Sequence, residues 1–311
     1  MSFGVSVDLD ELRHYRAIHG LPGSHDPGSA VLSAREFPVY ELALPRLLTW
    51  ARAEELPLTL FAVGADMAHA PAAEALRGAV REGHEIGNHT LDHRYDLVRL
   101  PLDEQRRQVL VGRDVLEQAT GQRPRGFRAP GYTLSEQLLD AVEESGAEYD
   151  ASVFPCPSYW AAKLAVMSGR RLAGGRSLAI VGDPRALVAP RTPYRRGARY
   201  FERGSGLRML PVQVTRGARL PFIGTSLVLA PSIARRALLV GLAGDSTVNL
   251  ELHGIEALDA GDGLSELAER QPDLRVPWQE KLARLSEIIR SLRASGRRAL
   301  THAELAKEAL P

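Results

Sequence analysis

The chain has 311 residues, of which 44% are hydrophobic, and its 39 basic residues nearly balance its 38 acidic ones. This length and composition are typical of one large globular domain, and a net charge of +1 gives no sign of a nucleic-acid partner. The single cysteine, Cys156, excludes an internal disulfide framework and a zinc site built from cysteines alone.

The first residues and the most apolar stretch are the places where a signal for export or membrane insertion would stand. Residues 1–15 lack a basic start and carry acidic residues early, so they do not resemble a signal peptide. The stretch 226–244 is interrupted by Pro231 and by Arg235 and Arg236, so we do not expect it to span a membrane. We therefore expect a cytoplasmic protein.

Strands alternate with helices along the chain, which favours a parallel sheet. Apolar runs predict strands at 3–10, 57–64, 84–89, 124–130, 246–254 and 297–301, with 147–154 as strand or loop. Helical periodicity and capping residues predict helices at 38–56, 70–83, 101–121, 135–146 and 278–296, and a last helix after the capping box at 301–304. Pro45 is a candidate break in the first helix, and 11–37 is expected as loop.

Residues 156–220 do not continue this alternation and are expected to form an insertion. Between Lys163 and Arg219 the chain has 13 lysines and arginines but only two acidic residues. One interpretation is a solvated lid or an oligomer contact. The other is a basic and aromatic patch that contacts anionic lipid at the inner face of the membrane.

Polar residues of the kinds used in catalysis stand at several predicted strand ends, where chemistry gathers in parallel α/β folds. Asp8 and Asp10 end the first strand and point to the same side of it. Two carboxylates so close repel each other unless a cation neutralises them. Arg128 follows another strand and needs a carboxylate partner if it is buried.

Two histidines follow the strand 84–89. His89 and His93 are four residues apart, so they share one face of a helical turn and can bind one metal ion. An isolated pair of this kind is more often a surface pair. His253 ends the strand 246–254, where alternation places it on the same face as Glu251, and a buried structural histidine is the alternative there.

Taken in order, these motifs resemble those of the polysaccharide deacetylases, the NodB-homology family of carbohydrate esterases. "GHEIGNHTLDH" at 83–93 is similar to the family's second motif, "FRAPGY" to the third and "LELHGI" to the last. The first motif differs, because the acids of "VDLD" are separated by Leu9 instead of adjacent. The family's aspartate–tryptophan element, which orients the acid histidine, is not located in this sequence, where "PSYW" at 157–160 has a tryptophan but no aspartate. Glu251 is a guess for that role.

The resemblance implies a single domain over 1–311, folded as a distorted, seven-stranded (β/α) barrel with the insertion at about 156–220. It implies a divalent ion, most simply Zn²⁺, bound by Asp10, His89 and His93. Asp8 would act as base, Arg128 would hold Asp8, and His253 would act as acid. Pro130 and Tyr132 would contact the substrate.

The implied reaction is hydrolysis of an N-acetyl or N-formyl amide on an amino sugar, with a polyprenyl-phosphate-linked glycan as one candidate substrate. Two alternatives stay open. One is a metal-dependent amidohydrolase that acts on a non-sugar amide or imide. The other is a catalytically silent protein that binds glycan or lipid.

Overall fold

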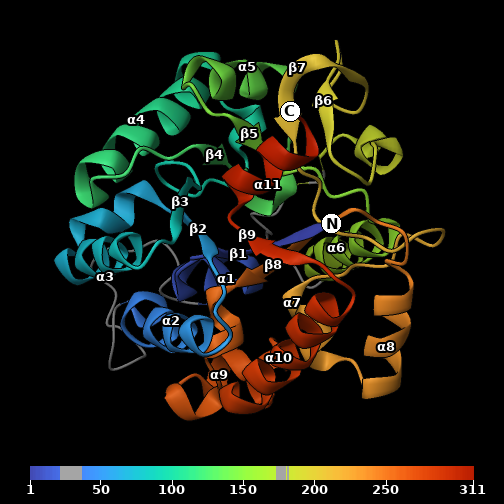
Figure 1. Ribbon diagram of the computed structural model, residues 1–311. Coiled ribbons are helices and arrows are strands. Elements are labelled where there is room, and N and C mark those ends of the chain that lie inside the picture. Colours follow the sequence, from blue (N-terminus) through green and yellow to red (C-terminus); the bar gives the residue numbers. More distant parts are fainter. Residues whose placement is uncertain (22–36, 173–179, 181) are drawn as a thin grey trace.

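The sheet is a curled ring of parallel strands surrounded by helices (Figure 1). The structure is a computed structural model that describes residues 1–21, 37–172, 180 and 182–311. The strands are β1 (Ser2–Asp8), β2 (Leu58–Ala62), β3 (Glu85–Asn88), β4 (Gly126–Phe127), β5 (Tyr149–Asp150), β6 (Tyr194–Arg196), β7 (Arg203–Met209), β8 (Thr247–His253) and β9 (Arg298–Leu300). In the described residues, seven parallel strands follow one another in the order β7-β5-β4-β3-β2-β1-β8. The predicted (β/α) barrel is confirmed.

Strand β1 lies at the centre of this sheet and has three partners. β8 pairs with its whole length, with Ser2 opposite Thr247 and Asp8 opposite His253. The other edge of β1 is shared, because β9 pairs with Ser2–Gly4 and β2 pairs with Val5–Asp8. A strand held on both sides along its length is a rigid support for the groups at its end.

The barrel is distorted where β7 should meet β8. Instead of a regular ladder, the backbone N–H of Gln213 donates to the carbonyl of Asn249 at 3.1 Å. The side-chain amide of Asn249 donates to the carbonyls of Leu210 and Pro211 at 3.0 and 3.1 Å. These bonds close the ring without a paired strand.

The helices are α1 (Leu12–His19), α2 (Leu44–Ala53), α3 (Ala70–Arg81), α4 (Leu102–Thr120), α5 (Glu136–Glu144), α6 (Pro157–Leu172), α7 (Gly224–Leu229), α8 (Ser232–Val240), α9 (Ser265–Ala268), α10 (Trp278–Ala294) and α11 (His302–Ala309). The helices predicted from periodicity are confirmed to within a few residues. Pro45 stands where a π-helical turn, Val39–Ala43, passes into α2, so the candidate break is a change of helix type and the chain stays helical. The predicted capping box at Thr301 and Glu304 is present at α11.

Two expectations need correction. The expected loop 11–37 contains helix α1, which begins after Glu11 and ends at Gly20 in the left-handed conformation. Residues 22–36 of that loop lie outside the described part of the chain. In the expected insertion, β7 is a strand of the sheet, because it pairs in parallel with β5 and buries Leu207 and Met209. Residues 173–179 and 181 of that segment also lie outside the described part.

Helix α11 covers one end of the barrel and lies across the middle of Figure 1. Its Ala303 and Ala306 pack with Phe61 and Tyr149 in one buried cluster. The polar groups at this end are bonded to one another, since Glu85 accepts from Thr59 Oγ1 at 3.0 Å and from the backbone N–H of Ala303 at 2.9 Å. The interior of the barrel is therefore filled at this end of the strands.

Within the described residues, no helix has both the length and the apolar content needed to cross a bilayer.

Candidate active site

The six residues predicted from the motifs converge at the carboxyl ends of the strands. Asp8 and His253 are direct neighbours in the β1–β8 ladder. His89 follows β3 and Arg128 follows β4, and these two strands are also neighbours. The short turn after β1 brings Asp10 to the same place. Five of the six side chains are buried, and His253 is partly exposed.

Asp10, His89 and His93 form a tight group. Oδ1 of Asp10 lies 3.0 Å from Nε2 of His89 and 3.1 Å from Nε2 of His93. One ligand atom from each of the three residues lies within 4.8 Å of the other two. Burial acts to raise the pKa of Asp10, but the two histidines outweigh it and hold that pKa well below its usual range.

The imidazole of His89 is oriented by a second bond. Its Nδ1 lies 2.7 Å from the carbonyl oxygen of Arg128, so Nδ1 carries the proton and donates. Nε2 is then the free lone pair, and it faces Asp10. Histidines that bind metals are usually fixed in this way by their other nitrogen.

Local backbone geometry places His93. Thr90 and His93 both have positive φ, 71° and 52°, so the chain turns sharply after β3. The hydroxyl of Thr90 accepts from the backbone N–H of His93 at 3.0 Å and stabilises this turn. The expected helical face is therefore replaced by a left-handed turn that brings the two imidazoles to a ring separation of 4.7 Å.

The three residues fit a divalent cation. Oδ1 of Asp10 and both ring nitrogens of His93 are buried and lack a hydrogen bond of good geometry. These atoms lie close together but are not oriented to hydrogen-bond with one another. Burying them in this way lowers the stability of the fold unless a ligand binds between them. Ligands about 2.0–2.2 Å from a tetrahedral zinc ion lie roughly 3.3–3.6 Å apart, close to the distances found here.

Arg128 is fully buried and bound to Asp8. Its Nη1 donates to Oδ1 of Asp8 at 2.5 Å and to Oγ of Ser6 at 2.9 Å. Its guanidinium lies 4.2 Å from the centre of the Phe61 ring. A Cβ on Gly87 would lie only 2.4 Å from that ring, so the glycine of "GHEIGNH" leaves room for it. Burial raises the pKa of Asp8, and Arg128 opposes that rise.

His253 is paired with Glu251. Nδ1 of His253 lies 2.7 Å from Oε1 of Glu251, two residues earlier on the same face of β8. Burial acts to lower the pKa of His253, but Glu251 outweighs it and raises that pKa well above its usual value. Glu251 thus contacts His253 as the residue that orients it would, the role for which the sequence offered Glu251 as a guess.

Aromatic residues surround these groups. Tyr132, predicted as a substrate contact, has φ 58° and packs against Phe154 and Tyr159. Pro130, the other predicted contact, begins the turn that carries Tyr132. The ring of Tyr15 meets that of His253 edge-on at 6.3 Å. The hydroxyls of Tyr15 and Tyr132 are buried without a hydrogen-bond partner.

Sequence reasoning missed Ser6, Tyr15 and His14. The ring of His14 lies 4.1 Å from that of His93, and its Nε2 is buried without a partner. Asp10 and His14 are four residues apart, the same spacing that identified His89 and His93 as a pair. It was overlooked because 11–37 was expected as loop.

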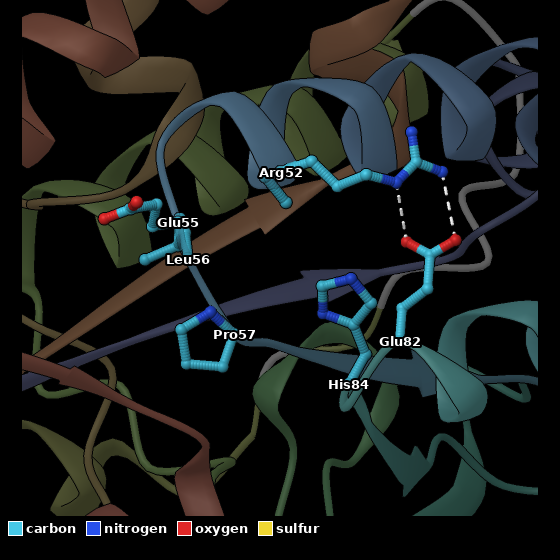
Figure 2. A pocket seen from close by; sticks show the side chains of 7 residues that line it. Arg52, Glu55, Leu56, Pro57, Glu82 and His84 are labelled. Atoms are coloured by element: carbon cyan, nitrogen blue, oxygen red, sulfur yellow. Dashed lines mark hydrogen bonds and ion pairs between the residues drawn. The ribbon is translucent and has the colours of Figure 1, made fainter.

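A separate hollow of about 600 Å³ lies at the other end of the strands. Figure 2 shows its wall, where Arg52 binds Glu82 through two hydrogen bonds of 2.8 and 3.0 Å. His84 lines it, and Nδ1 of that residue accepts from the backbone N–H of Leu58. None of the six predicted residues lines this hollow.

Within the described residues, four arginines of the basic segment have acidic partners. Arg196 binds Glu136, Asp140 and Glu143, and Arg191 binds Asp245. Arg185 binds Asp183, and Arg216 also binds Asp245. Arg208 and Arg219 donate to backbone carbonyls. These contacts reduce the charge that this segment can offer to a lipid surface.

Known proteins share the fold and part of the sequence. The polysaccharide deacetylase family profile matches residues 38–149. A peptidoglycan deacetylase from Helicobacter pylori is 26% identical over 147 residues, which cover 47% of this chain and 47% of that protein. The chain thus matches about half the length of this relative.

Solved structures extend the likeness to the whole chain. A presumed polysaccharide deacetylase from Mycobacterium smegmatis superposes with a TM-score of 0.62 at 18% identity, over 99% of this chain and 90% of that one. An allantoinase, PuuE, gives 0.57 at 18% identity, over 98% and 89%. At such identity these two structures show the fold alone. The profile match and the shared fold make the chain similar to the polysaccharide deacetylase, or NodB-homology, family.

Proposed function

We propose that this protein is a metal-dependent hydrolase that removes the acyl group from an N-acylated amino sugar. The observation that carries the proposal is the meeting of three groups at one place: the Asp10, His89 and His93 cluster, the Asp8–Arg128 pair and the Glu251–His253 pair. Amide hydrolysis needs a means to activate water, a base and an acid, and each group suits one of these tasks.

Asp10, His89 and His93 would hold the ion, and two imidazoles with one carboxylate suit zinc. When bound, the ion polarises the acyl carbonyl and makes a water molecule more acidic. The buried carbonyl of Arg128 keeps His89 in the tautomer that presents Nε2 to this position.

Asp8 would accept the proton of the attacking water. Its carboxylate lies beside the cluster, with Oδ2 3.9 Å from Nε2 of His89. Burial favours the neutral acid, so the positive charge of Arg128 is needed to keep Asp8 ionised before the reaction. The same bond orients the carboxylate and leaves Oδ2 free for the proton.

His253 would donate a proton to the departing amine. A general acid must carry its proton near neutral pH, and Glu251 raises the pKa of His253 in the required direction. The contact at Nδ1 leaves Nε2 as the donor to the substrate. Glu251 would therefore be the orienting group that polysaccharide deacetylases take from a separate element.

The identities of the sugar and of the acyl group are the finer part of this proposal. The relative from Helicobacter pylori is named a peptidoglycan deacetylase, which supports an N-acetylated amino sugar. The aromatic rings of Tyr15, Tyr132 and Tyr159 suit the apolar face of a sugar ring, with Pro130 beside them. A polyprenyl-phosphate-linked glycan and a cytoplasmic location stay predictions, and the paired arginines give the lipid contact no support.

The test is acetate or formate release from a panel of substrates by the protein loaded with Zn²⁺. The panel holds N-acetylglucosamine oligomers, N-formylated amino sugars and small cyclic amides. We expect release from the sugars, and complete loss after chelation with recovery when Zn²⁺ is restored. Turnover of the cyclic amides alone would favour the amidohydrolase alternative, to which the shared fold of the allantoinase draws attention. Metal binding without any turnover would favour the silent binding protein.

A further inference from the structure

We propose that Lys163 of α6 recognises a negatively charged substituent, so that the substrate is an anionic amino sugar. This inference rests on the proposed function and adds the charge class of its substrate. The substituent is an oxyanion attached to the sugar, either a carboxylate or a phosphate.

Lys163 reaches the loop that borders the site. Its Nζ donates to the carbonyl of Gly131 at 2.9 Å, three residues after Arg128. A Cβ built on Gly131 would lie 3.4 Å from this Nζ and 3.2 Å from Cδ1 of Tyr95. The Tyr95 ring in turn meets the His93 ring edge-on at 5.0 Å. The Tyr95 ring thus borders both the Gly131 loop that Lys163 contacts and the cluster of Asp10, His89 and His93.

The charge of Lys163 is not neutralised by the protein. Among the described residues, no carboxylate lies within 4.0 Å of its Nζ, whereas Arg185, Arg191 and Arg196 of the same segment each have acidic partners. Burial alone lowers the pKa of Lys163, to about 8. A partly buried ammonium group without a counter-ion is destabilising, so a ligand that supplies the counter-ion gains this energy on binding.

The hydrogen bond to Gly131 does not explain why the side chain at position 163 is positively charged. A backbone carbonyl needs one hydrogen-bond donor, which a neutral side chain could supply at less cost. The ammonium group has three donors, and one of them is used. Tyr159, one turn earlier on α6, has its ring 5.7 Å from Nζ, and burial raises the pKa of both Tyr159 and Tyr95. These neighbours stay neutral, so none of them supplies an anion to the remaining donors.

The experiment compares the native protein with Lys163→Gln, which keeps a neutral donor, and with Lys163→Arg, which keeps the charge. Three probes share the acetamido group: methyl N-acetylglucosaminide, which is neutral, N-acetylmuramic acid, and N-acetylglucosamine 1-phosphate. Binding is measured by calorimetry and turnover by acetate release, both on Zn²⁺-loaded protein. Circular dichroism confirms that the variants are folded.

We expect the native protein to bind at least one anionic probe about 10- to 100-fold more tightly than the neutral one, the range of a charge-assisted hydrogen bond. Lys163→Gln should remove this preference and leave the neutral probe within about 3-fold, while Lys163→Arg keeps most of it. The preference should weaken in the native protein as pH rises through about 8, because the ammonium group loses its proton, but not in Lys163→Arg. Which anionic probe responds identifies the carboxylate or the phosphate.

The two proposals fail separately. Charge preference in binding, with no acetate or formate release from any amino sugar of the substrate panel, would refute the proposed function and leave the role of Lys163 intact. Acetate release with equal binding of neutral and anionic probes would refute the role of Lys163 alone. An equal loss for all probes in Lys163→Gln would also overturn it, because the residue would then only support the loop at Gly131.

Discussion

The two ends of the barrel both contain buried polar side chains, yet they differ in hydrogen bonding. At the α11 end, Glu85 accepts from Thr59, Tyr149 and Ala303, and Asn249 contacts Nε2 of His302 at 2.6 Å. At the opposite end, Asp10, His93 and Glu251 have buried atoms without a hydrogen bond of good geometry. The Phe61 ring contacts residues of both ends, because it packs against the guanidinium of Arg128 and lies edge-on to the ring of His302.

This difference indicates which buried polar groups stabilise the fold and which are available to bind a ligand. Buried polar atoms with partners stabilise one arrangement of the strands, whereas buried atoms without partners lower stability and persist when a ligand uses them. Both ends contain histidines and carboxylates, so residue type alone does not distinguish them. The clustering of unpartnered atoms does, because at the α11 end Nδ1 of His302 lacks a partner beside a fully bonded Glu85, whereas several such atoms lie together at the opposite end. Three changes test the distinction.

The largest effect is expected from removing a histidine of the metal-ligand cluster. His89→Ala should abolish both zinc content and activity, because one of three ligands is lost, as measured by elemental analysis and acetate release. His302→Ala is the matched control at the other end and should retain zinc in the folded protein. Full activity in a zinc-free His89→Ala protein would contradict the ligand assignment.

Removing the acid should affect turnover without affecting the metal. His253→Ala should retain zinc and lower kcat about 10²- to 10⁴-fold, the range of general acid–base catalysis. Steady-state initial rates of acetate release at saturating substrate give this value. Unchanged kcat would remove His253 from the mechanism and leave the metal-ligand cluster unaffected.

The smallest effect is expected at the α11 end. Glu85→Ala leaves the Tyr149 hydroxyl and the Ala303 N–H without their acceptor, so the free energy of unfolding should fall by about 2–5 kcal/mol. Urea denaturation measures this loss, and kcat of the folded variant should stay unchanged. A lower kcat with unchanged stability would show that the two ends are not separate in function.

The site was predictable where it depended on local sequence. Alternation along β8 predicted that Asn249, Glu251 and His253 share a face, and all three contact groups inside the barrel. The residues at strand ends were predictable because parallel strands present their carboxyl ends together.

Features that depend on distant segments were not predictable. Helix α1 was missed because Glu11 binds the backbone N–H groups of Val39 and Tyr40 as well as that of Leu12, and no local pattern indicates such a tie. The sheet position of β7 depends on pairing with β5 more than 50 residues earlier. The contact of Lys163 with Gly131 likewise joins two segments that the sequence keeps apart.

The pairing of β1 has a consequence for the order of folding. Only β2 can pair with it early, since β8 and β9 begin at Thr247 and Arg298. The carboxylate of Asp8 therefore gains its neighbour His253 only when long loops close, which is an entropically slow step. Chains halted before this step would have Asp10, His89 and His93 within reach of one another while the acid is still absent, so the proposed metal site would form before the proposed acid is in place.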